Sequence, residues 1–167
     1  MTQGSRYRLP RTVTPSAYDL EWWVDPAEPT AKGTVRIAIT VHEPVTEIVL
    51  NGTDLVVEPT GVRVMSSDGK AVPATGVVVE SADERLTMTF ADPLPVGDHE
   101  LQIAFTALVN DHMEGLYRSR YTLAGQEHVV IATHFEATDA RRAFPCWDEP
   151  DLKATFAITL VVPDGMA

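Results

Sequence analysis

Two side chains that could bind a charged group lie close together at the end of a predicted strand. His134 and Glu136 belong to an alternating stretch that predicts a strand over His128–Glu136. Side chains two apart in a strand share a face, so both are expected on the face away from the core. A carboxylate held there, partly shielded from water, would bind an ammonium group well, because charge-assisted hydrogen bonds strengthen away from bulk solvent. The opposite, core-facing side is expected to carry Val129, Ile131, Thr133 and Phe135.

The same residues also allow simpler interpretations. Glu136 could be a solvated glutamate at a strand end, and the physics of the residues alone favours that role. Cys146, the only cysteine, could act as a nucleophile with His134 as its base. Free cysteines are more often small buried hydrophobic residues, and this is the role we expect for Cys146.

The segment that follows the strand combines charged and apolar residues. Thr138 or Asp139 is expected to cap a short helical turn over Ala140–Phe144 by accepting a backbone N–H group. The two arginines of that turn, Arg141 and Arg142, are expected to pair with Asp139, Asp148 or Glu149.

Two prolines restrict the backbone of the next few residues. Pro145 and Pro150 flank Cys146–Glu149, which predicts a stiff loop with Trp147 as its apolar anchor. Such a loop suits a contact between domains.

The histidines do not show the spacing of a metal site. His128 and His134 are six residues apart, roughly 20 Å along an extended strand, so they cannot share one ion. The pairs His42-Glu43 and His99-Glu100 lack a second histidine four residues after the first, so neither is the zinc-binding helix motif. The sequence therefore predicts no metal ligands and no catalytic residues within this chain.

Hydrophobic alternation with a period of two residues dominates the chain and predicts strands. No amphipathic helix of ten or more residues is indicated. Turn signals separate the strands, for example Asn51-Gly52 and Asp68-Gly69. We therefore expect an all-β fold, an antiparallel curved sheet or β-sandwich. The apolar faces of the clearest strands are Tyr18, Leu20, Trp22 and Val24; Val35, Ile37, Ile39 and Val41; Leu86, Met88 and Phe90; Leu101, Ile103 and Phe105; and Phe156, Ile158, Leu160 and Val162.

Composition excludes several classes of partner. The 24 acidic and 13 basic residues give a formal charge of −11, which repels nucleic acid and anionic membranes. Met1–Arg11 lacks the apolar core of a signal peptide, and no apolar run approaches the ~20 residues of a membrane helix. With one cysteine, no internal disulfide can form. We expect a cytoplasmic protein that binds neither nucleic acid nor membranes.

The 167 residues suit one domain. The last predicted strand runs into Pro163-Asp164-Gly165, a turn that would normally lead to another strand. We therefore expect residues 1–167 to be a single β domain cut from a longer protein.

One long and compositionally unusual block, Phe135–Pro150 with Lys153–Phe156, carries a family resemblance, and shorter matches precede it at Leu9-Pro10, Tyr18–Leu20, Gly33–Val35, Leu50-Asn51, Asn110, Met113–Gly115 and Tyr117–Ser119. With these residues the chain resembles the N-terminal domain of the aminopeptidase N family of zinc metallopeptidases, especially its puromycin-sensitive and alanyl aminopeptidase branch. The resemblance covers most of the chain.

The resemblance implies a specific role for Glu136. In the family, the matching acid helps bind the free α-ammonium of a peptide substrate inside the active-site cleft. A glutamate of a Gly-Ala-Met-Glu-Asn motif completes that pocket, and zinc and a general-base glutamate activate the attacking water. Those motifs belong to a catalytic domain beyond residue 167, so the resemblance places the zinc outside this chain. The implied partners are a peptide with a free N-terminus and that missing catalytic domain.

One residue departs from the family pattern. His134 stands where the relatives usually have glutamine, which lines the first side-chain pocket. A neutral imidazole could replace its hydrogen bonds, whereas a protonated one would repel the substrate ammonium; free histidine gains its proton near pH 6.5.

Two other functions remain open. An epoxide hydrolase of the leukotriene type shares this fold, although its relatives carry glutamine at the position of Glu136. A non-enzymatic scaffold of the same fold would not need an acid there.

Overall fold

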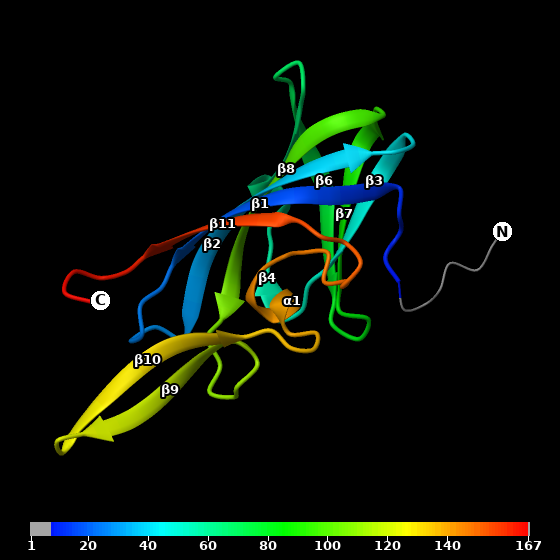
Figure 1. Ribbon diagram of the computed structural model, residues 1–167. Coiled ribbons are helices and arrows are strands. Elements are labelled where there is room, and N and C mark those ends of the chain that lie inside the picture. Colours follow the sequence, from blue (N-terminus) through cyan, green and yellow to red (C-terminus); the bar gives the residue numbers. More distant parts are fainter. Residues whose placement is uncertain (1–7, 167) are drawn as a thin grey trace.

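A computed structural model describes residues 8–166 (Figure 1). Nine strands form one sheet in the order β11-β1-β2-β8-β5-β6-β7-β3, with β4 paired to β8, and β9 and β10 form a second, two-stranded sheet. The elements are β1 (Val13–Trp23), β2 (Thr30–Val41), β3 (Val45–Asn51), β4 (Leu55–Val56), η1 (Pro59–Gly61), β5 (Val62–Ser66), β6 (Ala71–Glu80), β7 (Arg85–Leu94), β8 (Gly97–Leu108), β9 (Gly115–Leu123), β10 (Gln126–His134), α1 (Ala140–Ala143) and β11 (Thr155–Val161).

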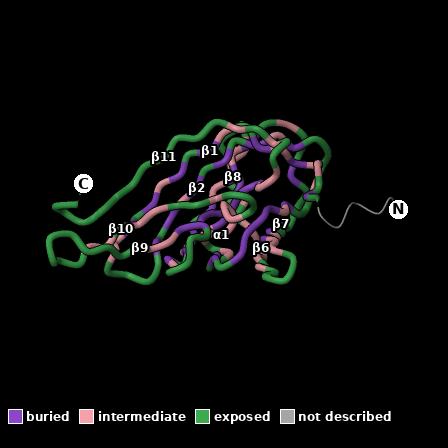
Figure 2. Tube along the Cα trace, turned by 60° about the horizontal axis from the view of Figure 1, so that its bottom comes forward, coloured by how far each residue is buried: buried purple, intermediate pink, exposed green. Residues whose placement is uncertain are grey.

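The large sheet curls into an open half-barrel and buries the apolar face of its strands on the inside (Figure 1). The alternation read from the sequence matches this burial: Leu20, Val35 and Ile37 are completely buried, as are Leu86 and Leu101. Figure 2 shows the buried stretches concentrated in the middle of the molecule. The prediction of an all-β fold built on a curved sheet is confirmed.

The direction of one strand differs from the antiparallel prediction. β11 pairs with β1 in parallel, from Ala17 opposite Thr155 to Trp23 opposite Val161, so the sheet is mixed. Strands joined by a hairpin, such as β1 and β2 or β6 and β7, must run antiparallel, but β1 and β11 lie at opposite ends of the chain. No short turn fixes their relative direction.

The β9–β10 hairpin extends away from the large sheet (Figure 1). The sequence predicted a core-facing side for β10, and this prediction is wrong over most of the strand. Thr133 is exposed, and Val129 is only half-buried. Ile131 and Phe135, near the base, do pack against the core as partly buried residues. A two-stranded ribbon has no second layer to cover it, so alternation alone does not produce burial here.

The segment Phe144–Trp147 supplies the interior layer that the curled sheet surrounds. All four of its residues are buried. Cys146 and Asn51 exchange two backbone hydrogen bonds, of 2.8 and 3.2 Å, and the Trp147 N–H donates to the Tyr18 hydroxyl at 3.1 Å. The segment is thus fixed to both β3 and β1.

A close approach between β2 and β8 gives a test of this packing. Gly33 stands opposite Phe105, and a Cβ added at Gly33 would lie 2.3 Å from the Phe105 ring carbon Cζ. We expect Gly33→Ala to lower the free energy of unfolding by about 1–3 kcal/mol, because the buried ring must shift. In a Phe105→Leu background the same substitution should cost much less. Urea unfolding of the four variants measures both values, and equal costs in the two backgrounds would contradict the contact.

Candidate functional site

Glu136 lies just beyond the end of β10 and not inside the strand. β10 ends at His134, which stands opposite Gly115 of β9, and a turn over residues 136–139 follows. The peptide bond between Glu136 and Ala137 is cis. The predicted strand, His128–Glu136, therefore begins and ends two residues too late, and strand alternation does not place His134 and Glu136 side by side. The turn is what positions Glu136.

Both predicted binding residues are open to solvent. His134 and Glu136 are exposed, and within residues 8–166 no hydrogen bond or ion pair engages either side chain. The three other acids of the 133–150 segment are all paired: Asp139 with Arg142, Asp148 with Arg141, and Glu149 with Arg11. Of the four acids in residues 133–150, Glu136 is the one whose carboxylate has no partner among the described residues.

The residues on both sides of Glu136 hold its turn in place. The ring of Phe135 packs edge-on against Phe144, with the centroids 5.9 Å apart. The Asp139 N–H donates to the Phe135 carbonyl at 3.0 Å and closes the turn. An exposed carboxylate is thereby carried on a backbone that is anchored in the core.

The helical turn was predicted correctly, but its capping was not. α1 covers Ala140–Ala143, and Asp139 occupies the N-cap position without a side-chain capping bond. Its carboxylate instead accepts a hydrogen bond from Arg142 Nε at 3.0 Å. A charge-assisted bond to a guanidinium is stronger than one to a backbone N–H group, which accounts for the exchange.

Arg141 joins three parts of the chain. Its guanidinium lies 2.9 Å from Asp148 Oδ2 and 2.7 Å from Glu84 Oε2, and its carbonyl accepts the Thr53 N–H at 3.1 Å. The side chain is 12% exposed, so these pairs are largely shielded from water. Burial lowers the pKa of Arg141, but hydrogen bonding and charge pairing with Asp148 and Glu84 outweigh it and raise the pKa above its usual value. The charge of Arg141 is used to hold the fold.

The predicted pairs of the two arginines are confirmed in part. Arg141 with Asp148 and Arg142 with Asp139 form as expected. Glu149 does not join them, because it accepts the Leu9 N–H and pairs with Arg11. The pairs with Glu84 and Asp54, which lie far away in the sequence, were missed.

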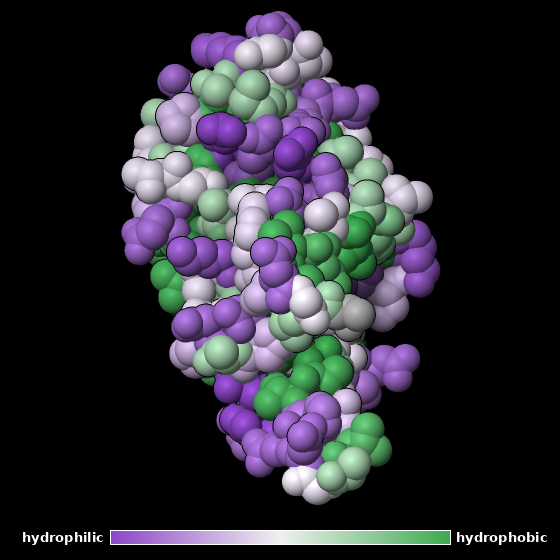
Figure 3. Space-filling model, turned by 90° about the vertical axis from the view of Figure 1, so that its left-hand side faces the viewer, coloured by the Kyte–Doolittle hydropathy of each residue, from purple (hydrophilic) through white to green (hydrophobic). Residues whose placement is uncertain are grey.

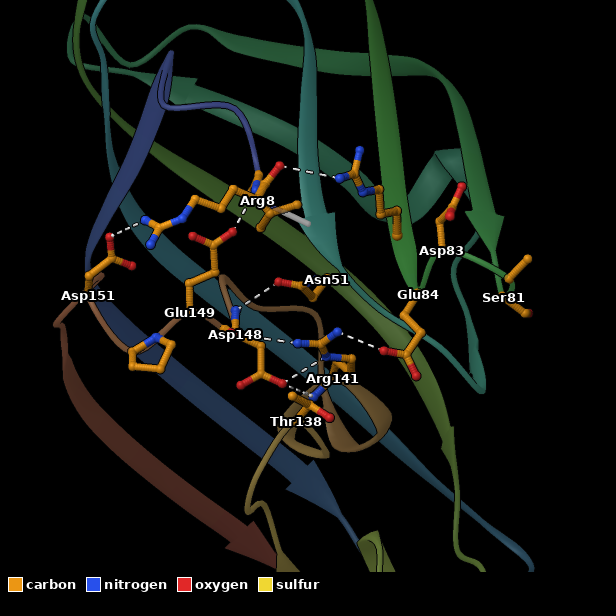
Figure 4. Close-up of a pocket in the computed structure, with 14 residues that line it drawn as sticks. Arg8, Asn51, Ser81, Asp83, Glu84, Thr138, Arg141, Asp148, Glu149 and Asp151 are labelled. Atoms are coloured by element: carbon orange, nitrogen blue, oxygen red, sulfur yellow. Dashed lines mark hydrogen bonds and ion pairs between the residues drawn. The ribbon is translucent and has the colours of Figure 1, made fainter. Parts of the chain in front are cut away.

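A cavity of about 800 Å³ opens beside this network (Figure 4). Thr138 and Arg141 line it together with the 81–85 and 148–151 segments and Arg8. Figure 4 shows Arg141 pointing between Asp148 and Glu84, and Arg8 lying near Asp151. The arginines of the cavity are thus engaged by its own acids and carbonyls, and neither His134 nor Glu136 lines it. This arrangement of ion pairs fits a structural role, in which the network holds separate segments of the chain together.

Cys146 has the buried role that the sequence favoured. The residue is 3% exposed, and burial, followed by the nearby charge of Asp148, raises the pKa of its thiol well above the usual value. Burial likewise raises the pKa of Tyr18. A thiol kept protonated in the core is a poor nucleophile, so the Cys146–His134 alternative has no support.

Gly115 is a positioning residue that sequence physics did not identify. It has φ +61°, and an added Cβ would lie 2.6 Å from Arg142 Cβ and 3.0 Å from the Asp139 carbonyl oxygen. The start of β9 therefore approaches the Glu136 turn and α1 closely, and only a residue without a side chain fits. The one signal in the sequence was its place in the Met113–Gly115 match.

No group of three or more His, Cys, Asp or Glu residues that could hold a metal ion occurs in the part of the chain that the structure describes. In the same part, no helix has the length and apolar character needed to cross a membrane.

Comparison with known proteins gives a consistent family. Residues 14–167 match the model of the Peptidase M1 N-terminal domain. Aminopeptidase M1-B of Oryza sativa subsp. japonica is 42% identical over 159 residues, and Aminopeptidase M1 of Arabidopsis thaliana is 43% identical over 160 residues; each match covers 95% of this chain. Aminopeptidase N of Canis lupus familiaris is 34% identical over 173 residues, or 97% of this chain. The chain spans 18% of the length of each of these three relatives. The aminopeptidase resemblance is confirmed.

The close approach at Gly115 predicts a position-specific loss of stability. We expect Gly115→Ala to cost about 2–4 kcal/mol of unfolding free energy, since it adds a clash with Arg142 and Asp139 to the conformational cost of a positive φ. Gly125, at the tip of the same hairpin, has φ +80° and nothing within 4 Å of an added Cβ, so Gly125→Ala is the matched control. Chemical denaturation compares the two. Equal losses would mean that the contact contributes nothing.

The buried thiol predicts both slow labelling and a pH effect. At pH 8, iodoacetamide should label Cys146 about 100-fold more slowly in the folded protein than in urea, as followed by the mass of the adduct. An unfolded thiol ionises near pH 8.5 and the folded one does not, so the free energy of unfolding should fall as the pH rises above that value. Rapid labelling under native conditions would show that the thiol is accessible.

Proposed function

Because the chain belongs to the Peptidase M1 N-terminal domain family, we propose that it is the N-terminal β domain of a zinc-dependent aminopeptidase, which removes N-terminal residues from peptides. The named relatives are aminopeptidases and thus hydrolases. The domain contributes to substrate binding and does not carry out the reaction alone.

The observation that carries the proposal is the free carboxylate of Glu136. It is exposed, unpaired among the described residues, and placed on a turn that Phe135 and the Asp139 N–H anchor. In the complete enzyme, this carboxylate accepts hydrogen bonds from the α-ammonium of the substrate. A fixed negative charge at that point selects peptides with a free N-terminus, because a blocked N-terminus has no positive charge to pair with it.

His134 lies two residues before Glu136 and shares its exposure. We assign it the lining of the pocket for the first side chain, where a neutral imidazole offers one donor and one acceptor.

The zinc ion belongs to another part of the longer protein. We place its ligands outside residues 1–167; among the described residues, no group of three or more potential ligands lies together. Zinc would supply the Lewis acid that activates water. What this chain adds is the orientation of the substrate N-terminus, and residues 1–167 alone are not expected to hydrolyse peptides.

We place the enzyme in the cytoplasm, with no nucleic-acid or membrane partner. A formal charge of −11 disfavours contact with phosphates and anionic lipids, and a single cysteine suits a reducing compartment. One yeast relative, 39% identical, is named "Aminopeptidase 2, mitochondrial", so fractionation of cells is the direct check.

Glu136→Gln in the full-length protein tests the anchoring role. The variant keeps the shape of the side chain but loses its charge, so we expect kcat/KM for aminoacyl-anilide substrates to fall about 10- to 100-fold, the loss of one charge-assisted hydrogen bond. Zinc content, measured by atomic absorption, should not change.

Glu127→Gln is the matched control for that experiment. Glu127 is an exposed acid of the same hairpin that pairs with Arg120, so its replacement removes one charge without touching the turn. It should leave kcat/KM near the wild-type value. Wild-type kinetics for Glu136→Gln, or equal losses in the two variants, would rule out the role assigned to Glu136.

A further inference from the structure

The edge strand β11 carries an apolar face that residues 8–166 leave mostly exposed. Phe156, Ile158 and Leu160 are 54%, 57% and 60% exposed, and every residue of β11 is exposed. The sequence pattern predicted a core-facing side for this strand, so that prediction is wrong for this chain by itself. Figure 3 shows apolar side chains gathered in the middle of one side of the molecule and again lower down.

This apolar face continues a layer that is buried on the neighbouring strand. Tyr18, Leu20 and Trp22 of β1 are 4%, 0% and 4% exposed. They stand opposite the three apolar residues of β11 in register, and the rings of Tyr18 and Phe156 stack with centroids 4.7 Å apart. The interior of the half-barrel therefore extends onto β11, where Phe144 contacts the ring of Phe156 but Ile158 and Leu160 remain mostly exposed.

The backbone of β11 has a free side as well. The Val24 N–H donates to the Val161 carbonyl at 2.9 Å, so the backbone groups of Val161 point toward β1. Peptide groups alternate along a strand, so those of Phe156, Ile158 and Leu160 point the opposite way, to the edge of the sheet. Within the described residues β11 is the last strand on this side, and that row of N–H and C=O groups has no strand beside it.

A turn at the end of β11 reverses the direction of the chain. The Met166 N–H donates to the Pro163 carbonyl at 3.3 Å, and Gly165 has φ +86°. A positive φ at the third position is what a type II turn requires, and such a turn reverses the chain. Any residues that follow are sent antiparallel to β11.

We propose that a segment after residue 167 of the full-length polypeptide pairs with the free edge of β11 as an antiparallel strand, and that its side chains and those next to it cover Phe156, Ile158 and Leu160. The inference rests on that part of the proposed function which makes this chain a piece of a longer protein. The relatives, of which the chain spans 18%, have ample length for such a segment.

A second copy of the chain fits this edge less well. Two copies would bring together two molecules of formal charge −11, which repel each other. The Pro163–Met166 turn also reverses the molecule's own chain, and because β1 occupies the other side of β11, a returning strand that joins the sheet would take the position that the second copy would need. An intramolecular strand has neither difficulty, since it is tethered beside the edge at a high effective concentration.

Hydrogen exchange of the full-length protein tests the pairing residue by residue. The amides of Phe156, Ile158 and Leu160 should exchange about 100-fold or more slowly than in an unstructured peptide, because a strand pairs with them. The amides of Ala157 and Thr159 point to β1 and should be protected whatever occupies the edge, which makes them internal controls. Mass spectrometry with fragmentation at single-residue resolution reads both sets.

Fast exchange of the first set, with slow exchange of the second, overturns the proposal. Protection that disappears on dilution would mean that a second copy occupies the edge, and it also overturns the proposal. Substitution gives a separate readout: Ile158→Lys should lower the unfolding temperature of the full-length protein more than Thr159→Lys, which alters the other face of the same strand. Equal effects would count against a covered face.

These outcomes are independent of catalysis. Exchange is measured without substrate, so an inactive protein with a protected edge would refute the peptidase proposal and leave this one intact. An active aminopeptidase with a rapidly exchanging edge would do the reverse.

Discussion

The burial of Phe144–Trp147 inside the curled sheet is the constraint on which the other features depend. Backbone hydrogen bonds tie Cys146 to Asn51, and the Tyr18 hydroxyl accepts the Trp147 N–H, so this segment is fixed to two strands that lie far from it in the sequence. The Glu136 turn comes just before it, and β11 follows soon after. An exposed carboxylate and an exposed apolar strand are therefore both held by one anchor in the core.

Charge pairing separates the structural acids from the available one. Arg141 and Arg142 are drawn against Asp148 and Asp139, with Glu84 and Asp54 completing the network. The positive charge of a largely buried guanidinium must be balanced by nearby carboxylates, so these acids stabilise the fold and are not free to bind a ligand. Glu136 has no such partner among the described residues. Residues 133–150 contain four acids that look alike in the sequence, and only the folded arrangement distinguishes Glu136 from the other three.

Local patterns predicted those parts of the fold that depend on local physics. Alternation located β1, β2 and β8 because these strands have one face on the core, as the burial of Leu20, Val35 and Leu101 shows. It failed for β10, whose ribbon lies outside the core, and for the parallel direction of β11. The partnership of Arg141 with Glu84 joins positions 57 residues apart, and no spacing rule encodes it. Strand alternation and the family resemblance together predicted a binding role for Glu136, whereas its lack of an ion pair depends on the folded arrangement of the arginines.

The buried segment Phe144–Trp147 also links the Glu136 turn to the exposed apolar face of β11. An ammonium group must meet its carboxylate within a few tenths of an ångström for a strong hydrogen bond, and an error near 1 Å would cost much of the benefit. Glu136 is on an exposed turn, but Phe135 joins that turn to Phe144, and Phe144 lies 6.4 Å from Phe156 of β11, centroid to centroid. A segment that covers β11 would therefore press on the same aromatic cluster that supports the Glu136 turn. Completing the apolar layer would restrict the cluster, and with it the position of the carboxylate, so the proposed docking of the remaining protein and the proposed binding of a substrate N-terminus would be physically connected through Phe144.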